Sequence, residues 1–528
     1  MKQGGEFMKE KLIIRKFILA LLMVMLFTGC STNQSASSNG DEKEDKAKDG
    51  GTLVIVRLAD AENLDHHFMN TINAASVTHG KVYEGLVGRD KDAQIQPLLA
   101  KSWKQIDSKT WEFKLRDDVK FHDGTLFNAS AVKTNFDRLL DPNVKAPRAG
   151  VFKMVSEVKV IDEFTVQFIL DESFAPLLSI LASHEGGIIS PKAIEKFGKN
   201  IINEPNGTGP FSFESWTPGK EIVLAKNDQY FGDKAKVDKV IFKIVPEETT
   251  RTSMIETGEA HIAEPLSVTM MDTVDASSAM EVYRSEGFGT EYIGFNTEKK
   301  PFNDIRVRKA IAHAIEMDSI IKGVFNNVGK KANSLLGSQV FGYHEGLKAY
   351  EYNLNEAKRL LAEAGYPNGL KTILSTNDVK ERVSLAEVVQ SQLKGIGVDV
   401  EIQVFEAGTF IEKRNRGESQ MFINSWRNAT GDADYNQYNL FHSSSKGPAG
   451  NVFFYSNERV DQLVNAGRIE SDPEKRIQIY AEAQELEMQD AVYVPVRVIE
   501  NVAAVSKKID GFRISAAGYL EINDVSIK

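Results

Sequence analysis

Few residues of the sequence have the types and spacing that catalytic or metal chemistry requires. The nine histidines are scattered, and only His66 and His67 are adjacent. Neighbouring residues on a loop cannot close a metal site by themselves, so the sequence predicts no metal centre. It contains no G-x-S-x-G elbow, H-E-x-x-H motif or Walker loop, and the glycines at 207 and 209 lead into Pro210 instead of a dinucleotide-binding helix. We therefore predict a protein that is not an enzyme and that uses no cofactor.

The composition is that of an acidic globular protein. Among 528 residues, 64 Lys and Arg stand against 74 Asp and Glu, which gives a formal net charge of −10 at pH 7. An acidic balance without a basic block argues against binding to a phosphate backbone, so we expect no nucleic-acid partner. With 42% hydrophobic residues the chain can build large cores. At about 150 residues per domain, its length predicts two to four domains.

The only cysteine, Cys30, follows a segment with the layout of a secretory signal. Basic residues precede the apolar run 17–27, and small residues stand directly before the cysteine. This order predicts a signal peptide over residues 1–29, and the apolar run is short for a membrane span. Gly29-Cys30 also resembles the lipobox of bacterial lipoproteins, although Phe27 stands where that box usually has Leu. The resemblance implies that Cys30 is lipidated; the alternative is a plain secretory signal with an incidental cysteine.

A polar segment follows the cysteine. Residues 31–51 contain no apolar residue larger than Ala. Because such a segment cannot offset the entropy of ordering the chain, we predict that residues 30–50 are the lipidated cysteine and a disordered tether. No later segment reaches the roughly 18 consecutive apolar residues of a membrane helix. We therefore expect an extracytoplasmic body that is anchored to the bacterial cell membrane by lipidated Cys30.

Strand patterns begin directly after the tether. Residues 52–56 are a short apolar, β-branched run that predicts a buried strand. Residues 111–116 and 159–170 alternate apolar with polar residues, as half-exposed strands of antiparallel hairpins do. Between them, Gly124 stands in a turn sequence where a positive φ is expected.

Helix patterns alternate with the strands. A helix over residues 131–140 follows Asn128, which is placed to cap it. An amphipathic helix over residues 384–396 leads through a glycine into a strand over residues 398–404. Helix, glycine and strand in succession predict an α/β fold.

Four blocks of the sequence form a series. They are Trp111-Glu112-Phe113-Lys114-Leu115-Arg116 with Phe121-His122-Asp123-Gly124-Thr125, then Gly207-Thr208-Gly209-Pro210-Phe211 with Asn227-Asp228-Gln229-Tyr230-Phe231-Gly232, then Gly294-Phe295-Asn296-Thr297 with Arg306-Val307-Arg308-Lys309-Ala310-Ile311, and finally Leu361-Ala362-Glu363-Ala364-Gly365-Tyr366-Pro367-Asn368-Gly369. In this order they resemble the family 5 extracellular solute-binding proteins of ABC importers, the peptide, nickel and glutathione class. The blocks lie between residues 111 and 369.

The resemblance implies an α/β, two-lobed periplasmic-binding-protein fold of the class II type, which closes over its ligand by a hinge. The chain should cross twice between the lobes. Lobe one is expected to comprise residues 51–287 and 501–528, with an extra subdomain over about residues 80–200. Lobe two is expected to comprise residues 288–500.

The resemblance also locates the ligand. In peptide-binding members an Asp three residues after a Trp captures the peptide's α-amine, but here Trp426 is followed at that spacing by Ala429. Burying an ammonium without a countercharge costs on the order of several kcal/mol, so another acid must substitute if ordinary peptides bind. Asp432 and Asp434 are the candidates; the alternative is that one or both cap the following helix. The run 429–435 is similar to that of the glutathione-binding branch.

Glutathione presents two carboxylates and one ammonium at neutral pH, so a matching cleft needs cations. Arg148, Arg382 and Arg427 are the candidates, and for each the alternative is a solvated surface arginine. Trp426 and Tyr435 would cover the ligand with apolar surface. The full set of expected ligand contacts is Glu62, Asn63, Leu64, Arg148, Arg382, Trp426, Arg427, Asn428, Thr430, Asp432, Asp434 and Tyr435.

The sequence favours a receptor over an enzyme. The leading hypothesis is a monomeric substrate-binding lipoprotein of an ABC importer that captures glutathione or a short peptide and delivers it to permease and ATPase subunits. The alternative is a nickel-chelate or haem-binding receptor on the same fold, motivated by His66, His67 and His442. A secreted hydrolase would require a nucleophile and a base that the sequence does not offer.

Overall fold

The computed structural model describes residues 49–69 and 71–528. The predicted signal peptide, Cys30 and nearly all of the predicted tether lie outside the described residues. The described residues, 49–69 and 71–528, belong to one compact unit. Among the described helices, none combines the length and the apolar character that a membrane crossing needs.

A mixed sheet of 11 strands is the largest sheet in the described part of the chain. Its strand order is β15-β14-β16-β12-β17-β11-β1-β10-β9-β8, and β13 pairs with β17. The sheet combines parallel pairs, such as β1 with β10 and β14 with β15, with antiparallel ones, such as β12 with β17. The strands are β1 Thr52–Arg57, β8 Phe211–Thr217, β9 Glu221–Lys226, β10 Lys239–Ile244, β11 Ile262–Glu264, β12 Met280–Phe295, β13 Lys330–Lys331, β14 Leu370–Asn377, β15 Val398–Phe405, β16 Met421–Arg427 and β17 Tyr493–Ser506.

A separate antiparallel sheet has four strands in the order β4-β5-β7-β6. Its strands are β4 Ala100–Asp107, β5 Thr110–Leu115, β6 Val155–Asp162 and β7 Thr165–Leu170, so the hairpins predicted from alternating residues are confirmed. Three further strand pairs are short: β2 Val87–Arg89 with β3 Ile95–Pro97, β18 Ile509–Asp510 with β21 Ser526–Ile527, and β19 Arg513–Ile514 with β20 Leu520–Glu521.

Helices pack around these sheets. Asn128 caps α3 by accepting a hydrogen bond from the Ala131 amide, and Gly124 has a φ of +81°, as the sequence predicts. The helices are α2 Ile72–Thr78, α3 Ala129–Leu140, α4 Leu177–Leu181, α5 Pro191–Phe197, α6 Glu248–Glu256, α7 Met271–Asp275, α8 Ile305–Ala314, α9 Met317–Phe325, α10 Leu354–Glu363, α11 Lys380–Lys394, α12 Ala407–Asn415, α13 Ala433–Asn436, α14 Glu458–Ile469 and α15 Pro473–Gln489. Short 3₁₀ or π turns are η1 Ala149–Phe152, η2 His184–Gly186, η3 Gly198–Asn203, η4 Val268–Met270, η5 Gln437–Phe441, η6 Ser443–Ser445 and η7 Gly447–Ala449.

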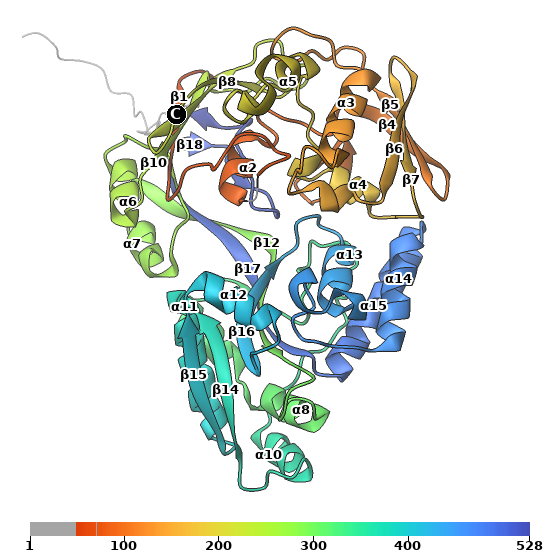
Figure 1. Ribbon diagram of the computed structural model, residues 1–528. Helices are drawn as coiled ribbons and strands as arrows, with labels where there is room; N and C mark the ends of the chain where they lie inside the picture. Colours follow the sequence, from red (N-terminus) through yellow and green to blue (C-terminus); the bar gives the residue numbers. More distant parts are fainter. Residues whose placement is uncertain (1–48, 70) are drawn as a thin grey trace, which may run out of the picture. The chain divides into compact units, whose positions relative to one another are not determined.

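The two long strands β12 and β17 connect the halves of the sheet. They pair with each other from Met280 to Gly294, and Figure 1 shows them running side by side from the neighbourhood of β1 to that of β16. Both predicted crossings between lobes fall within these strands. The lobe boundaries themselves stay a prediction, and we use lobe one and lobe two below for the residue ranges given above.

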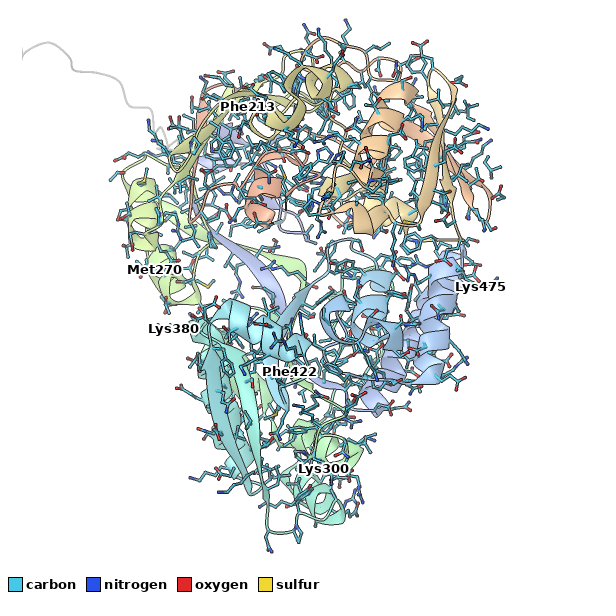
Figure 2. The ribbon with its side chains drawn as sticks, viewed as in Figure 1. Phe213, Met270, Lys300, Lys380, Phe422 and Lys475 are labelled. Carbon is cyan, nitrogen blue, oxygen red and sulfur yellow. The ribbon has the colours of Figure 1, made fainter. Side chains whose placement is uncertain are left out.

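The apolar core is divided into several clusters. One draws on residues 86–188, another on β1 and its neighbours together with residues 503–525, and a third on residues 293–400 with parts of β16 and β17. In Figure 2, Phe422 of β16 lies among the interior side chains, whereas Lys380 and Lys475 lie at the outside. A small cluster that includes Ala93 and Phe288 joins residues of both lobes.

Candidate functional site

The loop that follows β16 is shaped by one asparagine. The Asn428 side-chain oxygen accepts hydrogen bonds from the amides of Thr430 at 2.9 Å and Gly431 at 2.7 Å. Its amide nitrogen donates to the Asp432 carbonyl oxygen at 2.7 Å. Gly431 has a φ of +66°, a conformation that glycine adopts without strain. Asn428 and Thr430, both expected ligand contacts, therefore use their polar groups to hold the loop.

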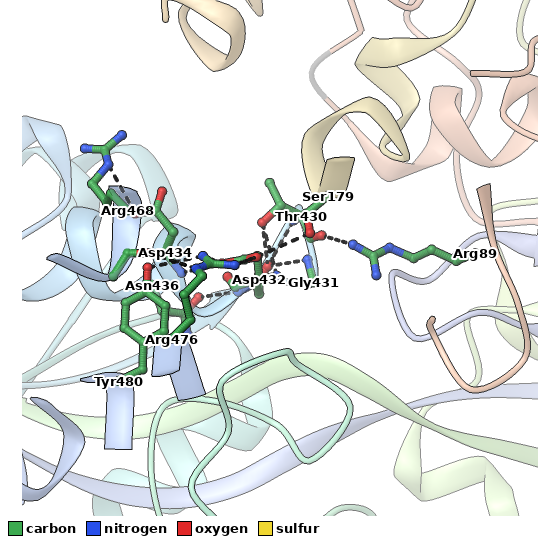
Figure 3. Close-up of polar contacts among 12 residues, drawn as sticks. Arg89, Ser179, Thr430, Gly431, Asp432, Asp434, Asn436, Arg468, Arg476 and Tyr480 are labelled. Carbon is green, nitrogen blue, oxygen red and sulfur yellow. Dashed lines mark hydrogen bonds and ion pairs between the residues drawn. The ribbon is translucent and has the colours of Figure 1, made fainter. Parts of the chain in front are cut away.

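Asp432 has a buried partner. Its carboxylate accepts hydrogen bonds from two nitrogens of Arg476, at 2.7 and 3.0 Å, and one from the Asp434 amide at the start of α13. Figure 3 shows this group with Ser179, whose hydroxyl lies 3.3 Å from the same carboxylate. Burial acts to lower the pKa of Arg476, but the Asp432 carboxylate raises it above its usual range. The helix-capping alternative is confirmed for Asp432.

Asp434 is also paired with an arginine. Its carboxylate lies 3.2 Å from the Nε of Arg468, and both side chains are largely buried. Burial raises the pKa of Asp434 to about 6 in spite of this cation. Both acids that could take the place of an amine-binding Asp at Ala429 thus already have a cationic partner within lobe two.

A group of four arginines and one carboxylate lies beside β16. Glu291 on β12 bonds to the Nε of Arg497 at 2.9 Å and to the Nε of Arg382 at 3.3 Å. Arg427 and Arg414 lie close enough that the charge of Arg382 contributes to lowering the pKa of each, after burial as the first cause. We call these five residues the arginine cluster. Its formal charge is strongly positive because one acid stands against four cations.

Arg427 is the least constrained member of the arginine cluster. Within the described part of the chain its guanidinium has no hydrogen bond or ion pair, and the residue is exposed to solvent. Burial is nevertheless the largest cause that lowers its pKa, followed by the charges of Arg382 and Arg497. The guanidinium is thus unpaired among the described residues, and its contact with a ligand stays a prediction.

The aromatic residues of the site lie against each other. Trp426 and Tyr435 have ring centroids 5.6 Å apart, and the indole nitrogen of Trp426 donates to Asn436 at 3.0 Å. Burial raises the pKa of Tyr435, and the Arg148 guanidinium of lobe one acts against that rise. Residues expected from both lobes, Arg148 and Tyr435, are thereby brought together.

Arg148 is bound to a carboxylate that the sequence did not single out. Its Nε donates to Glu185 at 2.9 Å, and the other oxygen of Glu185 lies 3.2 Å from the Nδ1 of His184. Burial acts to raise the pKa of Glu185, but His184 and Arg148 lower it to about 2. Arg148 is therefore partly neutralised, unlike Arg427.

The three ligand contacts expected after β1 differ in burial and in the hydrogen bonds that they make. Glu62 accepts a hydrogen bond from the Thr71 amide at 3.0 Å, and Asn63 donates to the Phe68 carbonyl oxygen at 3.2 Å. The Leu64 side chain is fully buried, and its carbonyl oxygen accepts the Tyr83 hydroxyl. A ligand contact of this segment would thus fall to Glu62 and Asn63.

The histidines that motivated a metal-chelate or haem receptor do not form one group. His66 and His67 are buried in lobe one, where His66 packs on Tyr83 and His67 meets Arg138 at 2.8 Å. His442 belongs to lobe two and stacks on Tyr438. No set of three or more metal-ligating side chains is gathered anywhere in the described ranges.

A cavity of about 500 Å³ opens two residues beyond Arg427, at Ala429. It is bounded by side chains of both lobes, including Lys81, Glu84, Arg89, Phe288 and Tyr519. Sequence reasoning missed these residues, because none of them stands in a motif. The one available signal is a lysine directly before the apolar run that begins at Val82.

Buried histidines predict a loss of stability in acid. Burial lowers the pKa of His66, His67 and His184, and lowers that of His79 to about 3. In the unfolded chain a histidine titrates near 6.5, so below this pH the unfolded state binds protons that the folded state excludes. For His79 the stabilisation is complete above pH 6.5 and is lost as the pH falls toward 3. When the pH is lowered from 7 to 5, the unfolding free energy of the wild type should fall. In His79→Gln this fall should be smaller by about 2 kcal/mol.

Urea denaturation at the two pH values measures this difference. The partly exposed His344 offers a matched control, and His344→Gln should follow the wild type. Equal losses in the wild type and His79→Gln would contradict the prediction. Comparison of variants is needed because burial also raises the pKa of Glu84 and Asp434, which acts in the opposite direction.

The sequence of this chain is similar to those of known proteins. A family model described as bacterial extracellular solute-binding proteins, family 5 Middle, matches residues 94–448. The chain is 32% identical to the glutathione-binding protein GsiB of Salmonella typhimurium over 485 residues, which are 90% of this chain and 94% of that protein.

Solved structures show the same architecture. The periplasmic binding protein DppA from Helicobacter pylori, in complex with the peptide STSA, matches with a TM-score of 0.75 and 30% identity, covering 91% of this chain and 98% of that one. HbpA2 from Haemophilus parasuis matches with a TM-score of 0.83 and 27% identity, covering 90% and 100%. The predicted α/β, two-lobed binding-protein fold is confirmed.

Proposed function

Because the chain belongs to the family 5 bacterial extracellular solute-binding proteins, we propose that it captures glutathione or a short peptide and delivers it to an ABC importer. Proteins of this family are solute receptors, and the chain is a receptor and not an enzyme. Permease and ATPase subunits are its proposed partners, and the protein acts as a monomer. Similarity to GsiB supports glutathione within the wider peptide class.

The arginine cluster is the observation that carries the proposal. A peptide or glutathione ends in a carboxylate, and a carboxylate that enters this cluster meets Arg427, which has no other partner among the described residues. Bonds between a guanidinium and a carboxylate are charge-assisted and can be bidentate. Arg382 and Arg497 remain fixed by Glu291 and add positive potential. The surplus charge thus selects an anionic ligand.

Ligand capture closes the protein in this proposal. The Trp426–Tyr435 pair of lobe two and Arg148 of lobe one lie where the lobes approach each other. A solute that touches both lobes binds the closed state more tightly, so it shifts the population toward closure. Small-angle scattering would then give a smaller radius of gyration with ligand.

Calorimetric titration tests the proposal. Protein purified without added ligand is first examined by native mass spectrometry for bound solute, then titrated with reduced glutathione and with Ala-Ala. Glutathione should bind more tightly, since Ala429 offers no acid to an α-amine and Asp432 and Asp434 are already paired. Binding of the dipeptide without binding of glutathione would reject the glutathione assignment, and binding of neither would reject the peptide class.

Membrane attachment is a second part of the proposal and has its own prediction. Cys30→Ser should release the protein into the medium, because the attachment point for the acyl chains is lost. One acyl chain gives only marginal membrane binding, whereas the two or more of a bacterial lipoprotein give stable anchoring. Cell fractionation and immunoblotting measure the distribution, with Ser31→Ala as the control. Equal membrane retention of Cys30→Ser and the wild type would rule out the lipid anchor.

A further inference from the structure

The cavity at Ala429 holds a lysine that lacks an acidic partner. Lys81 is 2% exposed, and its Nζ donates to one backbone carbonyl oxygen at 3.0 Å. The acids nearest to it are already bound: Glu521 pairs with Arg513 at 3.1 Å, and Glu264 pairs with Arg57. Burial lowers the pKa of Lys81 to about 7, so an anion placed beside Lys81 would stabilise its charged form.

A second cation of the cavity is in the same situation. Arg89 donates to the carbonyl oxygens of Ala93, at 2.6 Å, and Thr430, and it forms no ion pair among the described residues. The neighbouring carboxylate, Asp432, is bound to Arg476, as Figure 3 shows. Arg89 thus reaches from lobe one to the loop after Ala429 without being neutralised.

The buried acid of the cavity does not balance these charges. Both oxygens of Glu84 accept hydrogen bonds from neutral hydroxyls, those of Thr208 at 2.8 Å and Tyr230 at 2.6 Å. Glu286 pairs with Lys330 at 2.7 Å. The acids at 233 and 524 are exposed and Asp90 is partly exposed, so water screens their charges. The buried lining therefore holds two basic side chains, Lys81 and Arg89, against one acid, Glu84, which leaves one base in excess.

We propose that this cavity receives a second carboxylate of the ligand, with Lys81 and Arg89 as its counter-ions. The inference rests on the proposed function and narrows its substrate class. One carboxylate of the ligand binds the arginine cluster, and the opposite end, which enters the cavity beside Ala429, carries another. γ-Glutamyl peptides have this chemistry, because the glutamyl α-carboxylate is free, whereas an ordinary dipeptide presents only an ammonium at that end.

The size and place of the cavity suit this role. Its volume of about 500 Å³ lies within the range of small-molecule sites. Ala429, which lines the cavity, follows Arg427 by two residues, so their Cα atoms are at most about 7 Å apart. The proposal requires a ligand of about tripeptide length that extends from Arg427 past Ala429 into the cavity.

Two glutathione analogues separate the carboxylate from the ammonium of the glutamyl end. Glutaryl-Cys-Gly keeps the carboxylate and lacks the ammonium; 4-aminobutyryl-Cys-Gly keeps the ammonium and lacks the carboxylate. In calorimetric titrations of the wild type, glutaryl-Cys-Gly should bind at least as tightly as glutathione. The aminobutyryl analogue should bind about 10-fold more weakly or worse, because Lys81 and Arg89 would then remain unpaired.

The variant Lys81→Met tests whether the cavity causes the preference for a carboxylate at the glutamyl end. It should weaken glutathione and glutaryl-Cys-Gly by about 10-fold or more while leaving the aminobutyryl analogue nearly unchanged. The matched control Lys101→Met, at an exposed lysine paired with Asp117, should behave as the wild type. Circular dichroism checks folding, and Lys81→Gln serves as a second variant that keeps a polar side chain.

The titrations can reject the second carboxylate site or the proposed function itself. If the aminobutyryl analogue binds the wild type as tightly as glutathione does, or if both Lys81 variants retain full glutathione affinity, the second carboxylate site is overturned. If the wild type binds glutathione, both analogues and Ala-Ala equally poorly, the proposed function itself fails. The two failures are thus distinguishable by whether the wild type binds any of the four compounds.

Discussion

Replacing Arg427 by alanine should weaken glutathione binding by about 2 to 5 kcal/mol, a loss of about 30-fold or more. The reason is that this guanidinium is the unpaired cation of the arginine cluster, and removing it leaves the ligand carboxylate without its counter-ion. The other arginines cannot replace it, since Glu291 holds Arg382 and Arg497 in place. Isothermal titration measures the change directly.

Stability provides an internal check on this result. The Arg427 guanidinium bonds to no described residue, so Arg427→Ala should leave the melting temperature nearly unchanged while affinity falls. Arg459→Ala is the matched control, because Arg459 pairs with Glu482 on the surface of α14 and α15. If Arg427→Ala and Arg459→Ala bind glutathione equally well, the arginine cluster is not the ligand's carboxylate site.

Asp432→Ala should show the opposite behaviour, a large loss of stability. Arg476 is 5% exposed and would lose both of its bonds to the carboxylate. Removing one partner of a buried ion pair costs about 3 to 5 kcal/mol, because the remaining charge stays buried without compensation. Denaturation in guanidinium chloride, followed by fluorescence, gives the change in unfolding free energy.

An exposed pair supplies the control for this measurement. Glu482→Ala removes the partner of Arg459, and both side chains are about half exposed, so the cost should be below about 1 kcal/mol. A loss of that small size in Asp432→Ala would mean that Asp432 does not support the loop after β16. Its carboxylate would then become available again for a ligand amine.

Local features of the fold could be predicted where a few neighbouring residues decide the conformation. Asn128 caps α3 with its own side chain, and Gly124 turns the chain with a positive φ. Helix α11, the following turn and β15 all lie where their periodicity indicates, although α11 begins four residues earlier than expected. Its first turn begins with three charged residues in succession, Lys380, Glu381 and Arg382, so hydrophobic spacing does not reveal it.

The partners of the site residues could not be predicted in this way. Asp432 and Asp434 are paired with Arg476 and Arg468, which come from two later helices. Glu185 and Glu291, which hold Arg148, Arg382 and Arg497, are separated from most of these partners by long stretches of sequence. Such pairings arise only when the sheets assemble, and they decide which charged groups stay available. Residue type and spacing make Arg427 a candidate but cannot distinguish it from the arginines that tertiary contacts neutralise.

The ladder between β12 and β17 shifts register twice, between Glu286 and Thr290 and between Glu291 and Tyr292. Gly287 and Gly289 lie in the wider first gap, and a methyl group on Gly287 would come within 2.8 Å of the Ile499 carbonyl oxygen. Because β12 and β17 are not paired with each other over this gap, the two strands should bend most easily there. Elastic deformation during opening and closing should therefore concentrate over these few residues, while the paired segments on either side move as rigid bodies. Such a motion would leave the rungs on both sides of the gap intact.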